Sequence, residues 1–122
     1  MIIHHSVNYV ELPAPDLAAA KSFYGAAFGW SFADYGPPGA PAYVGFKSRP
    51  GDDEDGGFTP EAEPRGAGGP LILLYSDDLD ATVTAVQDAG GTILQDPYEF
   101  PGGRRFHFAD PAGNELGVWS SS

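Results

Sequence analysis

The chain has 122 residues, of which 42% are hydrophobic, and its formal net charge is −11 at pH 7. This length suits one globular domain with a modest core, and so acidic a chain is a poor candidate for binding nucleic acid. The absence of cysteine excludes disulfides, thiolate nucleophiles and thiolate metal ligands. No apolar run is long enough to cross a membrane, and no signal peptide is evident. We therefore expect a cytoplasmic protein that binds neither nucleic acid nor membrane.

The first half of the chain predicts a strand, a helix and three further strands. Residues 7–12 are expected to form a strand with Val7, Tyr9 and Glu11 on one face and Asn8, Val10 and Leu12 on the other, and Pro13 ends it. Asp16 is a good N-cap for a helix that ends at Gly29. Further strands are expected over 30–35, 42–47 and, as a short one, 57–59. An acidic, glycine-rich loop precedes the last of these, and a linker rich in proline, glycine and charge follows it.

The second half repeats this order. Strands are expected over 71–75, 92–95, 104–109 and 115–119, and the helix runs from its N-cap Asp78 to Gly90 and Gly91. A shift of 62 positions aligns residues 9–34 with residues 71–96, and seven of the 26 pairs are identical. The chain therefore predicts an α+β domain over 1–122 made of two tandem β-α-β-β-β units. Unit one covers about 1–60, the linker about 60–69 and unit two about 70–122.

Several short motifs carry a resemblance to a known superfamily. They are Asn-Tyr-Val-Glu-Leu at 8–12, Ser-Phe-Tyr at 22–24, Phe-Gly-Trp at 28–30, Asp-Asp-Leu-Asp at 77–80 and Asp-Pro-Ala-Gly-Asn at 110–114. With them the chain resembles the vicinal-oxygen-chelate superfamily of glyoxalase I, extradiol dioxygenases and bleomycin-resistance proteins. It looks most like the small bacterial glyoxalase-like members. The resemblance implies a cupped mixed sheet that encloses a pocket, and it also implies a homodimer.

The resemblance places a metal site at three positions that this chain has changed. Metal-using members carry two histidines and a glutamate where this sequence has Tyr9, Leu71 and Gly117. Leucine and glycine offer no donor atom, and a neutral phenol is a poor ligand for a divalent ion. We therefore predict no bound metal and no other cofactor.

The same positions predict a ligand pocket, because the resemblance makes Leu71 and Gly117 face inward. Alternation along each strand adds the neighbours that share those faces, with Arg105 and His107 at the polar end and free space beside Trp119. The expected pocket residues are Tyr9, Glu11, Leu71, Tyr75, Arg105, His107, Glu115, Gly117 and Trp119.

Three functions fit these features, and no catalytic residue can be assigned. The first is a metal-free protein that binds a small, partly apolar organic molecule. The second is an enzyme of the same superfamily, of lyase, isomerase or dioxygenase type. It would use either displaced metal ligands or metal-free acid–base catalysis by His107 with Glu115 or Glu11. The third is a module that associates with another protein.

Overall fold

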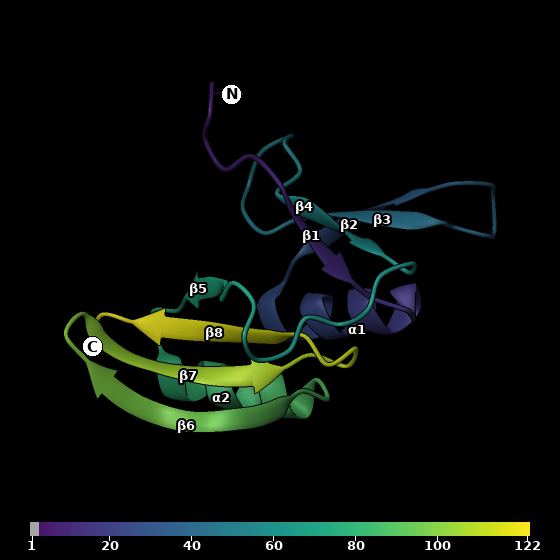
Figure 1. Cartoon of the computed structure of the whole chain (residues 1–122). Helices are drawn as coiled ribbons and strands as arrows, with labels where there is room; N and C mark the ends of the chain where they lie inside the picture. Colours follow the sequence, from purple (N-terminus) through teal and green to yellow (C-terminus); the bar gives the residue numbers. More distant parts are fainter. Residues whose placement is uncertain (1–2) are drawn as a thin grey trace.

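The computed structural model of the protein describes residues 3–122 and contains the two predicted units. The first unit comprises β1 (Val10–Pro13), α1 (Leu17–Phe28), β2 (Ser31–Tyr35), β3 (Tyr43–Lys47) and β4 (Gly56–Thr59) (Figure 1). The second comprises β5 (Leu73–Tyr75), α2 (Leu79–Asp88), β6 (Thr92–Phe100), β7 (Gly103–Ala109) and β8 (Glu115–Ser120). None of the helices in residues 3–122 is long and apolar enough to cross a membrane.

Each unit forms a four-stranded mixed sheet with the same strand order. Sheet A runs β1-β4-β3-β2, and sheet B runs β5-β8-β7-β6. The first strand of each unit pairs in parallel with the last, and the remaining pairs are antiparallel. The predicted α+β fold and its repeat are therefore confirmed.

The helices begin and end at the predicted residues. The side chain of Asp16 accepts a hydrogen bond from the Ala19 amide at 3.0 Å, and Asp78 does the same for Ala81 at 3.1 Å. Gly29 ends α1 with φ 72°, and Gly90 follows α2 with φ 100°. Both angles lie in the left-handed region, which glycine adopts at little cost.

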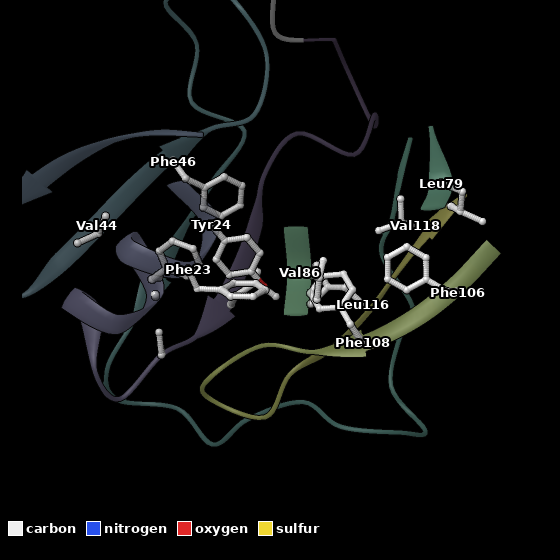
Figure 2. Close-up of a cluster of buried hydrophobic side chains, with 14 residues drawn as sticks. Phe23, Tyr24, Val44, Phe46, Leu79, Val86, Phe106, Phe108, Leu116 and Val118 are labelled. Carbon is white, nitrogen blue, oxygen red and sulfur yellow. The ribbon is translucent and has the colours of Figure 1, made fainter. Parts of the chain in front are cut away.

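The two units share one apolar core on the helix-covered faces of their sheets. Phe108 of β7 meets Phe23 and Phe28 of α1, with ring centroids 5.9 and 5.7 Å apart. Figure 2 shows core side chains of both units in one continuous cluster. Residues of unit two therefore complete the core of unit one.

The turn at 110–114 ties the two units together by hydrogen bonds. The Asp110 Oδ1 atom accepts the backbone amides of residues 112–114 at 2.9–3.0 Å. Its Oδ2 atom accepts the Tyr24 hydroxyl at 2.8 Å and the Asn114 Nδ2 group at 2.9 Å. The Asn114 amide also donates to the Pro13 carbonyl at 2.7 Å, so the turn contacts both α1 and the end of β1.

Three strand boundaries differ by two or more residues from those expected. Strand β1 begins at Val10 because its pairing with β4 begins there, and Val7 is 91% exposed. Strand β5 begins at Leu73, which leaves Leu71 outside the strand. Strand β6 continues five residues beyond Gln95, through Pro97, because two register shifts interrupt its pairing with β7. An edge strand tolerates a proline at such an irregularity, since no neighbour needs the missing amide.

Candidate functional site

The face of sheet B that points away from α2 gathers most of the predicted pocket residues. Alternate residues of β7 and β8 are buried in the core, so the residues between them lie on the opposite face. The strand register places His107 and Leu73 beside Gly117, and Arg105 and Tyr75 beside Trp119. We call this surface the open face of sheet B. Strands β6 and β7 curve along their length beneath it (Figure 1).

A row of four hydrogen-bonded polar side chains crosses this face. Glu115 Oε2 lies 2.9 Å from His107 Nδ1, and His107 Nε2 lies 3.1 Å from the Tyr98 hydroxyl. The Nε group of Arg105 donates to the same hydroxyl oxygen. We call these residues, Glu115, His107, Tyr98 and Arg105, the polar row.

The donors in the polar row follow from the chemistry of its ends. A carboxylate only accepts, so the hydrogen on His107 belongs on Nδ1, facing Glu115. The Nε2 atom of a neutral imidazole is then an acceptor, and the Tyr98 hydroxyl donates to it. Arg105 can only donate, so the Tyr98 oxygen accepts from it. Each hydrogen bond of the polar row therefore has one donor and one acceptor. Arg105 donates to Tyr98, Tyr98 to His107, and His107 to Glu115.

An aromatic cluster, made of Tyr75, Phe100 and Trp119, lies next to the polar row. Trp119 meets Tyr75 edge-on at 4.9 Å and Phe100 edge-on at 6.2 Å between ring centroids. The Arg105 guanidinium lies 5.4 Å from the ring centroids of both Tyr98 and Phe100. Cation–π contacts of this kind hold the guanidinium over the rings. The face therefore offers flat apolar surface next to hydrogen-bonding groups.

The space expected beside Trp119 is already occupied. A Cβ atom added to Gly117 would lie 2.5 Å from Leu73 Cδ2 and 3.3 Å from the carbonyl oxygen of Phe106. Leu73 is the residue paired with Gly117 across β5 and β8, and its side chain covers the glycine. The expectation of free space at Gly117 was therefore wrong, because the neighbouring strand fills it.

Tyr9 and Glu11 lie in the first unit, away from the open face of sheet B: Tyr9 directly precedes β1, and Glu11 is in it. The hydroxyls of Tyr9 and Tyr43 are 2.7 Å apart, and Tyr43 also donates to Glu11 Oε1 at 3.0 Å. Burial, followed by these two hydrogen bonds, raises the pKa of the Tyr43 phenol above its usual range. The hydrogen bond to Glu54 raises the pKa of Tyr35 on the same sheet. Tyr35 and Tyr43 therefore keep their phenolic protons to a higher pH than an ordinary tyrosine does.

A cavity of about 620 Å³ lies between the edge strands β1 and β5. Tyr9 and Tyr75 line it, whereas Arg105, His107 and Trp119 do not. The rest of its lining combines apolar core residues of both units, such as Phe46 and Leu116, with charged residues of unit one, such as Arg49 and Asp55. The predicted pocket residues therefore divide among the open face of sheet B, sheet A and this cavity. Leu71 precedes β5 and is 37% exposed.

The residues present do not fit the metal site of the superfamily. Across residues 3–122, no three His, Cys, Asp or Glu side chains converge in a way that would hold a metal ion. Tyr9 is hydrogen-bonded to Tyr43, and both ring nitrogens of His107 are engaged within the polar row. The absence of a bound metal stays a prediction.

Sequence reasoning missed Tyr98 and Phe100. The strand that carries them was expected to end at Gln95, because Asp96 and Pro97 are typical of a turn. The alternation Tyr-Glu-Phe at 98–100 was the signal that could have extended it.

The chain matches the family model described as Glyoxalase/Bleomycin resistance protein/Dioxygenase superfamily over residues 6–118. It is 33% identical over 130 aligned positions to the anthracycline biosynthesis protein DnrV of Streptomyces peucetius, covering 91% of this chain and 45% of that protein. It is 30% identical over 119 positions to the putative glyoxylase CFP32 of Mycobacterium tuberculosis, covering 94% of this chain and 45% of that protein. The chain thus spans about half the length of these curated relatives.

Solved structures show the same fold. TnmS3, an antibiotic binding protein from Streptomyces sp. CB03234, is 27% identical with a TM-score of 0.71, covering 100% of this chain and 99% of that one. A glyoxalase/bleomycin resistance protein/dioxygenase family enzyme from Burkholderia phytofirmans is 22% identical with a TM-score of 0.72, covering 96% and 99%. The family model spans nearly the whole chain, and the repeated β-α-β-β-β architecture agrees with it. The protein belongs to the glyoxalase/bleomycin resistance protein/dioxygenase superfamily.

Proposed function

We propose that the protein binds a small planar organic molecule on the open face of sheet B, without a metal. The observation that carries this proposal is the contact between the aromatic cluster and the polar row. Tyr75, Phe100 and Trp119 offer ring surface, and Arg105 adjoins both Phe100 and Tyr98. Sites for small organic ligands combine apolar surface with a few polar groups in this way.

The similar proteins support a ligand of this class. DnrV is named for anthracycline biosynthesis, and TnmS3 is described as an antibiotic binding protein. By analogy with them, we propose that the ligand is a polycyclic aromatic compound.

Equilibrium dialysis with quinizarin, a planar dihydroxyanthraquinone, tests this proposal. Trp119→Ala should weaken binding by about tenfold or more, because it removes ring stacking and buried apolar area together. The matched control is Tyr9→Ala, which removes a half-exposed aromatic ring directly before β1. Both variants need thermal melts to confirm that they fold. Binding that is lost in Tyr9→Ala and kept in Trp119→Ala would contradict the proposal and place the dye in the cavity between β1 and β5.

A second candidate function is a metal-free acid–base enzyme of the same superfamily. The observation that favours it is the 2.9 Å contact between His107 Nδ1 and Glu115 Oε2, since a carboxylate that orients a histidine is a common arrangement for proton transfer. Turnover of a bound compound, detected by mass spectrometry and lost in His107→Asn, would establish it.

We also propose that the protein forms a homodimer. Strands β1 and β5 are unpaired sheet edges that flank one cavity, and exposed edges favour association. Large apolar side chains are exposed beside both edges, among them Val7, Tyr9 and Leu73. Two copies of the chain would also match the length of the curated relatives, of which one copy spans 45%.

A further inference from the structure

Within the polar row, Tyr98 is better placed than His107 to form a hydrogen bond with a ligand. His107 is only 9% exposed, and both of its ring nitrogens already have partners. The Tyr98 side chain is partly exposed, and its oxygen accepts from Arg105 and donates to His107. A phenol oxygen has two lone pairs, so one acceptor position on Tyr98 is still available. A hydroxyl group of a ligand can therefore donate to Tyr98 but not to His107.

We infer that Tyr98 takes a proton from the ligand, and that the ligand is a planar phenol or enol that binds as its anion. This inference rests on the function proposed above, because it assumes that the ligand occupies the open face of sheet B. It adds the chemical class of the reacting group and the residue that accepts its proton.

The transfer balances without any further reactant. The O–H bond of the ligand breaks, and its proton forms a new O–H bond on Tyr98. The original Tyr98 proton moves to His107 Nε2, across the existing 3.1 Å contact. Nδ1 keeps its hydrogen, so an imidazolium forms between Tyr98 and the Glu115 carboxylate. The ligand becomes an anion, and no electrons are gained or lost.

The charges around Tyr98 favour these products. The new imidazolium is held by Glu115 at 2.9 Å, which offsets its positive charge. The ligand anion lies beside the Arg105 guanidinium, which contacts the Tyr98 oxygen and lies over the Phe100 ring. Because Phe100 in turn meets Trp119, the rings of a flat ligand have apolar surface adjoining the place where its oxygen is held.

Two dyes with the same ring system test the inference. Quinizarin absorbs at longer wavelength when a hydroxyl ionises, whereas 1,4-dimethoxyanthraquinone has no acidic hydroxyl. In neutral buffer, quinizarin bound to the protein should show the band of the ionised dye. Tyr98→Phe should lower that band by about tenfold or more, because the proton acceptor is gone. The same variant should bind the dimethoxy dye as tightly as the unchanged protein does.

Two further variants complete the design. Glu115→Gln removes the partner of the imidazolium without altering Tyr98, so it should also reduce the ionised band. Tyr9→Phe is the matched control, since it removes a hydrogen-bonded tyrosine hydroxyl from the first unit, and it should leave the band unchanged.

The outcomes separate the inference from the function on which it rests. Quinizarin that binds but keeps the spectrum of the neutral dye would overturn the inference and leave the proposed binding function intact. An ionised band that persists in Tyr98→Phe would overturn the role of Tyr98. Failure of both dyes to bind would contradict the proposed function, and the inference would fall with it.

Discussion

At the scale of single residues, the Asp110 side chain shows how one carboxylate can organise a fold. Its two oxygens accept the amides of its own turn, the Asn114 side chain and the Tyr24 hydroxyl of α1. Asp110 is 7% exposed and Tyr24 is fully buried, so the Tyr24 hydroxyl depends on this carboxylate for its hydrogen bond. The Asp-Pro-Ala-Gly-Asn motif therefore acts as a connection between the two units as well as a turn.

Tyr24 should make the protein sensitive to alkaline pH. Burial, and then the neighbouring Asp110 carboxylate, raise the pKa of the Tyr24 phenol well above 10.0. Above about pH 10 the unfolded chain releases this proton while the folded chain keeps it, so the free energy of unfolding falls as pH rises. Up to about 1.4 kcal/mol is lost per pH unit from this residue, until the pH reaches its folded pKa.

The test compares urea unfolding of the unchanged protein and Tyr24→Phe from pH 7 to pH 11. The variant should be about 1–3 kcal/mol less stable at pH 7, because Asp110 loses a buried donor. It should also lose stability less steeply above pH 10. Equal slopes in the two proteins would contradict this account.

At the scale of elements, β6 decides the composition of the candidate site. Its register shifts near Gln95 and Tyr98 let an edge strand pass through Pro97 and continue to Phe100. Tyr98 and Phe100 thereby join Arg105 on the same face. Without this irregularity, the strand would end before either aromatic residue reached the site.

The features that could be predicted from the sequence are those determined by local signals, such as helix caps and periodicity. The caps Asp16 and Asp78 and the repeat at a spacing of 62 predicted both helices and both sheets, because these features depend on neighbouring residues and strong periodicity. The same alternation correctly put Arg105 and His107 on one face. The bulged end of β6 and the side chain of Leu73 over Gly117 could not be predicted, because pairing across strands determines both.

Hydrogen exchange should divide residues 52–68 into slow and fast parts. The sequence marks this stretch as the most mobile, since it is rich in glycine, proline and acid. Strand β4 lies inside it, between β1 and β3, and its amides should exchange slowly. Residues 60–68 lie outside the sheets and most of their amides should exchange fast. Slower exchange is expected at Arg65, whose amide donates to Asn114 Oδ1 at 2.8 Å, and to a lesser degree at Glu61, whose amide donates to the exposed Thr59 hydroxyl at 3.3 Å. Slow exchange throughout the stretch would refute the prediction.

At the scale of the whole molecule, several large apolar side chains stay exposed beside two sheet edges. The core is continuous across both units, yet Tyr9, Leu73 and Tyr75 are 41%, 40% and 53% exposed at or next to β1 and β5. A second copy covering these edges would bury the side chains and occupy the unpaired backbone groups together.

Sedimentation equilibrium at tens of micromolar should therefore show a dimer. Leu73→Lys should shift the equilibrium towards monomer, because it places a charge at the proposed interface edge. The matched control is Leu94→Lys on the edge strand β6, where the leucine is 51% exposed, and this variant should stay dimeric. A monomer at this concentration for the unchanged protein would count against the proposal, as would identical behaviour of the two variants.

The hydrogen bond from Asn114 to the Pro13 carbonyl joins residues that are 101 positions apart. Contacts over such a distance form late, because a long loop must close first. During synthesis, unit one leaves the ribosome before residues 106–116 have been added to the chain. Until then, Phe23 and Phe28 lack their contact with the Phe108 ring of β7. Unit one is exposed to aggregation during that interval. Although the chain is built from two similar halves, its first half thus depends on the speed at which the second is translated.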